Sequence, residues 1–301
     1  MTEVKEAIRE DYVHSANSLF HFMSESAFLF SALKRQALCP RYCVEDISYL
    51  HIHNGDINFD KVAVLQKCFC DIPLRNIIKK FPVRLTENNS LSEEQKKRLH
   101  SGVAHTDLYG GYALAFSKKW GEENKLQPVH YLSEEAENTK QFTTMVSDVL
   151  ALDSIPDTIS DSILNMMCYF KPLRGTMSHR LVVGNSERVE CEIFKNFHDE
   201  HEWRFVPWGV YVEGNPLDCL IANSTVGSGY LSKMSKRIED VTFKAAWLPF
   251  RYEDIRYVIV PDYAERGRLI SFLCDLPFED VLQHDILISK ILVLDDIVKD
   301  F

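Results

Sequence analysis

The sequence lacks the motifs by which many enzymes hold a nucleotide. Its 301 residues contain no G-x-G-x-x-G fingerprint and no Walker loop, so a nucleotide would have to be bound in another way. There is no internal repeat, and no apolar run approaches the roughly 20 residues that span a bilayer. Residues 1–12 are charged, unlike a secretory signal. These absences predict a cytoplasmic protein with no membrane partner.

Positive charge is also scarce. The chain has 34 Lys and Arg residues against 44 Asp and Glu residues, which gives a formal net charge of −10. An acidic surface repels phosphate, so bulk non-specific binding of nucleic acid is not expected. Three local basic segments remain, each of which is either part of a groove or a solvated helix face: Lys79-Lys80 with Arg84, Lys96 to Arg98, and Lys233 to Arg237.

Eight cysteines are present, and without a secretory signal we expect them to be reduced thiols. Cys39/Cys43 and Cys68/Cys70 bracket two histidines, His51 and His53, so a zinc site has to be considered. The two spacings, x3 and x1, match zinc-binding knuckles poorly. Cys68-Phe69-Cys70 lies in an apolar run, where thiols behave as small hydrophobic groups. We therefore predict buried thiols and no metal.

Strand-like and helix-like segments are mixed without a regular βαβα order, which predicts an α+β fold in a single domain over residues 1–301. We expect strands at Leu19–Met23, Ile47–His53, Val62–Cys70 and Tyr112–Phe116, and a pair formed by Val189–Phe194 with 202–206. Helical spacing is seen at 134–152 and 160–170. A polar loop is expected at about 84–102, and an insertion at about 207–240.

Three short segments carry residues suited to chemistry. His21, followed by Phe22, lies inside an apolar strand and needs hydrogen-bond partners there. Tyr109 and Tyr112 flank a glycine pair, which allows close approach of a ligand beside two aromatic faces. Each of these also fits an ordinary core residue or turn.

The third segment, 197–207, reads FHDEHEWRFVP. On a strand, Glu200, Glu202 and Arg204 would share one face, while Trp203 and Phe205 would point into the core. This pattern fits a catalytic carboxylate pair, and it equally fits an exposed, ion-paired strand face.

Together these segments resemble the AbiGi family of bacterial phage-resistance proteins. The order of a histidine, tyrosines and Glu-x-Glu is also similar to the His–Tyr–Glu pattern of ADP-ribosyltransferases. The resemblance to AbiGi covers about two thirds of the chain through these segments: SLFHF at 18–22, PRYCVED at 40–46, CFCDIPL at 68–74, YGGYALAFSKKWG at 109–121, PVHYL at 128–132, Lys171-Pro172, and 197–207.

The resemblance implies an ADP-ribosyltransferase-like split antiparallel β-sheet core, surrounded by helices, that consumes NAD. Breaking the nicotinamide–ribose bond develops positive charge on the ribose, which a fixed carboxylate stabilises. Glu202 would take that role, and Glu200 would orient or deprotonate the nucleophile. The resemblance further implies that His21 binds a ribose and that Tyr109 or Tyr112 stacks on the nicotinamide, with Phe22 nearby. From their position in the chain after the first expected helix, Arg35 and Arg41 are expected to reach the pyrophosphate.

Three functions remain open at this point. The first is an NAD-dependent ADP-ribosyltransferase toxin of an anti-phage toxin–antitoxin system, with a nucleic-acid acceptor and a cognate antitoxin protein as partners. The second is a non-catalytic antitoxin or regulator with the same fold. The third is a metal-dependent nuclease or other hydrolase that uses the Glu200, Glu202 and His198 cluster.

Overall fold

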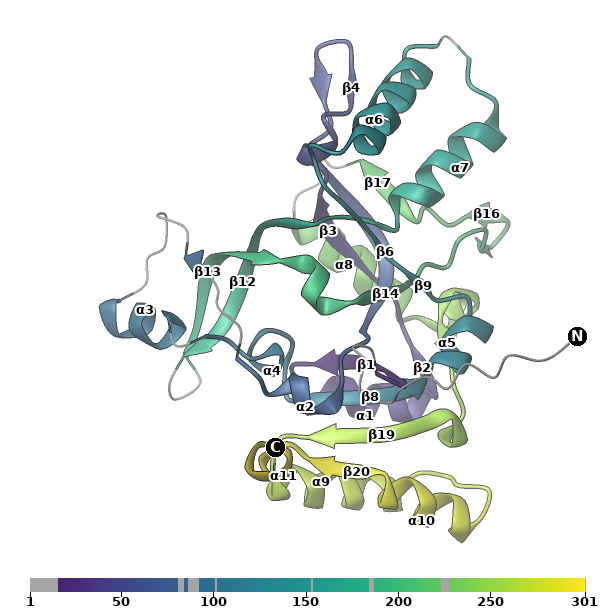
Figure 1. Ribbon diagram of the computed structural model, residues 1–301. Helices are drawn as coiled ribbons and strands as arrows, with labels where there is room; N and C mark the ends of the chain where they lie inside the picture. The colour runs from purple at the N-terminus through teal and green to yellow at the C-terminus, as the bar shows by residue number, and fades with distance from the viewer. Residues whose placement is uncertain are drawn as a thin grey trace, which may run out of the picture.

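A nine-stranded mixed sheet organises the computed structural model of the chain (Figure 1). The structure describes residues 16–80, 84–85, 92–100, 102–152, 154–183, 187–222 and 228–300. The strands of the sheet follow the order β20 (Ile291–Val293), β19 (Ile255–Val260), β8 (Tyr112–Ser117), β1 (Ser18–Met23), β6 (Lys61–Cys70), β14 (Glu202–Phe205) and β9 (Gln127–Pro128).

The longest strand of this sheet, β6, joins its two ends. Its sequence, KVAVLQKCFC, is an apolar run rich in residues that favour strands, and Val62 to Leu65 are at most 2% exposed. The first part of β6 pairs with β3 (Arg41–Asp46) and β17 (Leu220–Ala222), and its last part pairs with β14 and, at Cys70, with β1. One continuous strand therefore belongs to both halves of the fold.

Helices cover both faces. Helices α1 (Ser26–Arg35), α9 (Tyr263–Cys274) and α10 (Val281–Ser289) bury Leu29, Leu269 and Leu287 in a core with β1, β8 and β19. Helices α6 (Glu137–Leu150) and α7 (Asp157–Met167) pack a second core against the first half of β6. Helix α8 (Ser228–Ile238) packs on β3, so part of the expected insertion at 207–240 belongs to the main body, and β17 adds a strand to the sheet.

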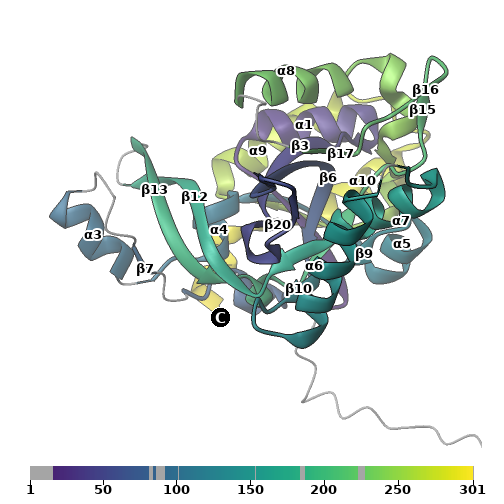
Figure 2. The same ribbon diagram turned by 90° about the horizontal axis from the view of Figure 1, so that it is seen from above.

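A long hairpin leaves the body of the molecule. Strands β12 (Arg174–Val183) and β13 (Glu187–Asn196) form it, and β7 (Arg84–Leu85) pairs with β13. Seen from above, the hairpin extends away from the side that carries α6 and α7 (Figure 2). At its base lie the parallel pair β10 (His130–Leu132) and β11 (Phe170–Pro172), and the short η3 (Phe197–Glu200). Figure 1 shows the same hairpin beside α3 (Glu93–His100).

Gly110 sets the path from α4 (His105–Tyr109) into β8. Its φ is +104°, a backbone conformation that residues other than glycine rarely adopt. A Cβ atom at this position would lie 2.1 Å from the backbone oxygen of Met23. The glycine therefore allows close packing against β1, and it places Tyr109 before the turn and Tyr112 after it.

The remaining elements are short. The helices and 3-10 turns among them are η2 (Ser48–Leu50), α2 (Leu74–Ile77), α5 (Lys118–Glu123), η4 (Val241–Ala246), η5 (Tyr252–Asp254) and α11 (Leu294–Asp300). The strands are β2 (Ala37–Leu38), β4 (His53–Asn54), β5 (Ile57–Asn58), β15 (Tyr211–Val212), β16 (Asn215–Pro216) and β18 (Leu248–Pro249). In the part of the chain that the structure describes, no helix is long and apolar enough to cross a membrane.

Several expected elements are confirmed, and two are wrong. The strands expected at 19–23, 62–70 and 112–116 and the helices at 134–152 and 160–170 correspond to β1, β6, β8, α6 and α7. No strand covers 47–53, and β13 pairs with β12 and β7 instead of with β14. The fold is mixed α/β, and the main sheet is mixed because β19 and β20 are parallel. An ADP-ribosyltransferase-like core stays a prediction, and part of the 84–102 loop lies outside the described residues.

Candidate functional site

The residues of the Glu-x-Glu segment meet a group of cations where β14, β11 and β13 converge. Glu200 ends η3, His201 turns the chain with a φ of +43°, and Glu202 opens β14. Lys171 comes from β11 and Lys195 from β13. Trp203 and Phe205 were expected to point into the core, with the charged residues on the other face. Instead Glu202 is 5% exposed and Arg204 0%, whereas Trp203 and Phe205 are only partly buried. Both strand faces are covered here, so the charged face is an interior one.

Arg204 is the most enclosed of these side chains. Its Nε donates to Glu202 Oε1 at 2.7 Å and one terminal nitrogen donates to Glu45 Oε1 at 2.9 Å. The other terminal nitrogen donates to the Cys168 carbonyl at 2.8 Å. The guanidinium thereby links β14 to β3 and to the end of α7.

Lys171 bridges the two carboxylates. Its Nζ lies 3.1 Å from Glu200 Oε2 and 2.5 Å from Glu202 Oε2. Glu200 Oε1 also accepts from Lys195 Nζ at 2.5 Å and from the Tyr109 hydroxyl. The acids of this network are Glu45, Glu200 and Glu202, and its bases are Lys171, Lys195 and Arg204. With three of each, the network balances its own charge.

The pKa shifts agree with this balance. Burial alone would raise the pKa of Glu202, but Arg204 and Lys171 outweigh it and lower the value to about 2. Burial opposes ionisation of Glu200 as well, and Lys171 and Lys195 hold its pKa well below the ordinary range. Both glutamates are therefore ionised at neutral pH, and each carboxylate oxygen of Glu200 and Glu202 has a donor from Lys171, Lys195 or Arg204.

His21 lies on the opposite face of the sheet from Glu202. Cys70 of β6 pairs with Glu202 on one side and with Phe20 on the other, so Phe20 and Glu202 point the same way. His21, one residue later, points to the other face, where it packs against Phe69 at 5.5 Å between ring centres. Its Nδ1 lies 2.8 Å from the Cys68 carbonyl. Burial, with Lys67 nearby, holds the pKa of His21 well below its ordinary value.

The two tyrosines are separated in the same manner. Tyr112 pairs with Met23, two residues after His21, and therefore lies on the His21 face, packed against the core of α1 and α9. Burial and a hydrogen bond to Glu265 raise the pKa of Tyr112 to about 12. Tyr109 is on the Glu200 side. Of the two tyrosines, only Tyr109 joins the carboxylates.

The remaining residues expected to bind NAD are dispersed. Phe22 is on the Tyr109 side, where its ring packs against His105, and His105 packs against Tyr109. Arg35 and Arg41 both lie close to Glu239, with nitrogen–oxygen distances of 3.7 and 3.5 Å. The structure thus brings together Glu200, Glu202, Tyr109 and Phe22 and places His21 and Tyr112 elsewhere.

Sequence reasoning did not identify the partners of the glutamates. Lys171 and Glu45 were noted only as members of family motifs, and Lys195 gave no signal. Tyr131, whose hydroxyl accepts from the Glu202 amide at 2.8 Å, was missed as well. Among the described residues, no three His, Cys, Asp or Glu side chains are grouped so that they could hold a metal ion.

Comparison with known proteins agrees with the motif-based resemblance. A family model described as "Putative abortive phage resistance protein AbiGi, antitoxin" matches residues 95–261. The chain is 31% identical over 276 residues to "Abortive phage resistance protein AbiGi" of Lactococcus lactis subsp. cremoris, which covers 88% of this chain and 100% of that relative. No solved structure matches the chain.

The description of the family corrects one expectation. The first hypothesis was an ADP-ribosyltransferase toxin, whereas the matching family is described as an antitoxin. The toxin hypothesis is therefore wrong, whereas no observation tests the expected protein partner. The arrangement of His21 on the face opposite Glu202 is consistent with this correction.

Proposed function

Because the chain belongs to the AbiGi family of abortive phage resistance proteins, we propose that it is a non-catalytic antitoxin or regulator of an abortive-infection system. It acts by binding a partner protein, and it carries out no reaction of its own. NAD and a nucleic-acid acceptor, which the transferase hypothesis required, have no role in it. A core related to that of ADP-ribosyltransferases is compatible with the proposal, and its support is the order of the sequence motifs.

One observation carries the proposal, namely the closed charge balance around Glu200 and Glu202. A carboxylate stabilises a developing positive charge only if its own charge is directed at the reacting atoms. Here Glu202 already contacts Arg204 and Lys171, and Glu200 already contacts Lys171 and Lys195. A substrate would have to displace these buried ion pairs, and each broken pair would leave a buried charge uncompensated.

The network has an evident structural role instead. Through Lys195 it fastens the β12–β13 hairpin to the body, and through Arg204 it fastens β14 to β3. Tyr109 adds α4 to the network, because its hydroxyl donates to Glu200. We infer that in this protein the buried ion pairs fix the arrangement of the elements that they join. A fixed surface is what a protein that acts by binding requires.

The proposal is tested in the native locus. We expect that deleting only this chain from its locus makes the remaining genes inhibit growth, and that supplying the chain from a plasmid restores growth. Expression of the chain alone should leave growth unchanged. Growth arrest on expression of the chain alone would contradict the proposal.

A second arm separates binding from chemistry. The double variant Glu202→Gln/Lys171→Met removes the candidate catalytic charge while it keeps the network neutral, and a thermal melt verifies that it folds. We expect this variant to restore growth as the wild type does. If a folded double variant fails while the wild type succeeds, the charge of Glu202 has a direct role, which the proposal denies.

A further inference from the structure

The main sheet ends in an unprotected strand edge. Strand β20 pairs with β19 on one side, and no strand that the structure describes pairs with its other side. Proteins commonly protect such edges with lysine, proline or a covering element. The three residues of β20 are Ile291, Leu292 and Val293. The preceding Lys290 donates to the carbonyls of Tyr252 and Glu253, so its charge is held by backbone acceptors.

The pairing with β19 shows which backbone groups face outward. The Val258 amide donates to the Lys290 carbonyl at 3.0 Å, so the carbonyl of Lys290 points toward β19. Successive residues of a strand alternate in this respect. The amide and carbonyl of Ile291 and the amide of Val293 therefore point to the open edge, where they can pair with an added strand.

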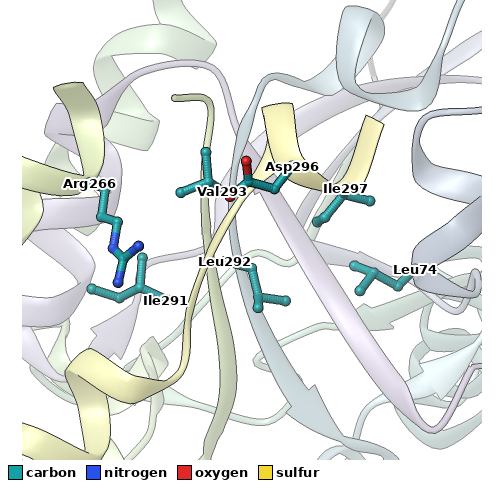
Figure 3. A pocket seen from close by; sticks show the side chains of 7 residues that line it. All are labelled: Leu74, Arg266, Ile291, Leu292, Val293, Asp296 and Ile297. Carbon is teal, nitrogen blue, oxygen red and sulfur yellow. The ribbon is translucent and has the colours of Figure 1, made fainter. Parts of the chain in front are cut away.

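A groove of about 250 Å³ follows this edge. Figure 3 shows Arg266 of α9 on one side of β20, with its guanidinium close to Ile291, and Leu74 of α2 and Ile297 of α11 on the other side. Asp296 lies at the end of the groove near Val293, and it accepts from the Tyr263 hydroxyl at 2.8 Å. The strand edge thus lies between Arg266 on one side and an apolar wall of Leu74 and Ile297 on the other.

Arg266 gives the groove its chemical preference. The side chain is partly buried, and its guanidinium makes no hydrogen bond or ion pair with any residue that the structure describes. Its neighbour on the same helix, Arg268, contacts Glu265 at 2.5 Å. A guanidinium in a partly buried, concave site pairs with planar anionic groups, and in an unmodified protein segment that group is a carboxylate.

We propose that the edge of β20 binds an extended segment of a partner protein as an added strand, with a carboxylate of that segment on Arg266. Main-chain hydrogen bonds to Ile291 and Val293 would hold the segment, and Leu74 and Ile297 would contact its apolar side chains. This proposal names where the partner of the proposed function would bind. It rests on the proposed function only in assuming that the protein acts by binding a partner.

A partner segment fits this edge better than a second copy of the chain. Each copy carries a net charge of −10, so two copies repel as they approach. A short segment with one acidic group meets little of that repulsion and satisfies Arg266. The edge is also only three residues long, which suits a short peptide better than an interface between two whole proteins.

The test measures peptide binding to the full-length protein by fluorescence anisotropy. One probe is a labelled seven-residue peptide of alternating valine and threonine with a central glutamate, and the second has lysine in place of glutamate. We expect the glutamate peptide to bind about tenfold more tightly, as a charge-assisted hydrogen bond implies. Arg266→Gln should abolish this preference, and Arg268→Gln, on the same helix, should retain it.

Two further measurements test the strand pairing. Val293→Pro removes an outward amide and should weaken binding of both peptides at least about tenfold, because the added strand loses a main-chain partner. If this variant does not fold, a glutamate peptide methylated on alternate backbone nitrogens replaces it, and this peptide should not bind the wild type.

Three results would overturn the proposal. These are absence of binding by both peptides, equal affinity for both, and a wild-type dimer in light scattering that Val293→Pro converts to monomer. No toxin or phage is used in the peptide assay. Intact peptide binding together with failed rescue of growth would therefore contradict the proposed function and leave the strand-edge site standing.

Discussion

Replacing Glu202 by glutamine tests directly whether the buried network supports the fold. The substitution keeps the size of the side chain and removes its charge, which leaves Arg204 and Lys171 with one carboxylate fewer between them. All three side chains are buried or nearly so, with exposures of 6%, 0% and 13%. Removing one partner of a buried ion pair typically costs about 3–5 kcal/mol.

This cost can be converted into a melting temperature. At about 2.1 cal/mol/K per residue, a chain of 301 residues has an unfolding entropy of about 630 cal/mol/K. Dividing about 3–5 kcal/mol by that entropy predicts that Glu202→Gln lowers the melting temperature by about 5–8 °C. Calorimetry or circular dichroism measures the shift.

The matched control is Glu135→Gln. Glu135 pairs with Lys140 at 3.0 Å, but the side chain of Glu135 is 85% exposed. Surface pairs contribute about 0–1 kcal/mol, so this variant should melt within about 1–2 °C of the wild type. The double variant Glu202→Gln/Lys171→Met should recover part of the loss, because it restores the charge balance. Equal melting temperatures for Glu202→Gln and Glu135→Gln would refute the reasoning.

Three other predictions follow from the described residues. Burial lowers the pKa of His105 to about 4 from 6.5, and the cations around Glu202 lower its pKa to about 2 from 4.5. The contribution of His105 to the free energy of unfolding should be complete above pH 6.5 and should be lost toward pH 4, because the unfolded state takes up a proton first. The contribution of Glu202 should be lost between pH 4.5 and 2, as the carboxylate loses its charge. Urea titrations across this range measure the free energy of unfolding. Gly110→Ala should be strongly destabilising because its Cβ would lie 2.1 Å from the Met23 oxygen, whereas Gly55→Ala, with no atom within 4 Å, should cost only the strain of its φ of +59°. NAD should leave the melting temperature unchanged, since His21 and Glu202 face opposite sides of the sheet, and an NAD-dependent rise would contradict this placement.

The buried strands could be predicted because apolar runs mark them directly. Strands β1, β6 and β8 are such runs, and each was found near its true position. The alternation at 47–53 was misleading for a local reason. The Asp46 side chain accepts from the Ser48 amide at 2.9 Å, which starts a turn, and His51 ends η2 with a φ of +48°. The Ser48 hydroxyl donates to the same oxygen at 2.6 Å, so β3 ends at Asp46 where this side chain caps the turn.

The charged site was only half predictable. Glu200, Glu202 and Arg204 are close in sequence, so their clustering was visible, but their partners come from β3, β11 and β13. Alternation along β14 shows which residues share a face, and it does not show whether that face is covered. A strand covered on one side only would have exposed these charges. Here β11 and the base of the hairpin cover them.

The separation of His21 from Glu202 depends on a register that the sequence does not contain. Phe20, and not His21, pairs with Cys70, and Cys70 pairs with Glu202. A shift of one residue would turn every side chain of β1 to the other face and would bring His21 beside the two glutamates. Such a shift would also move Leu19 out of the core of α1 and α9, where it is 0% exposed, and it would bury His21 where Phe20 now packs. The apolar side chains of β1 therefore fix its register, and that register determines that the histidine and the carboxylates cannot share one active site.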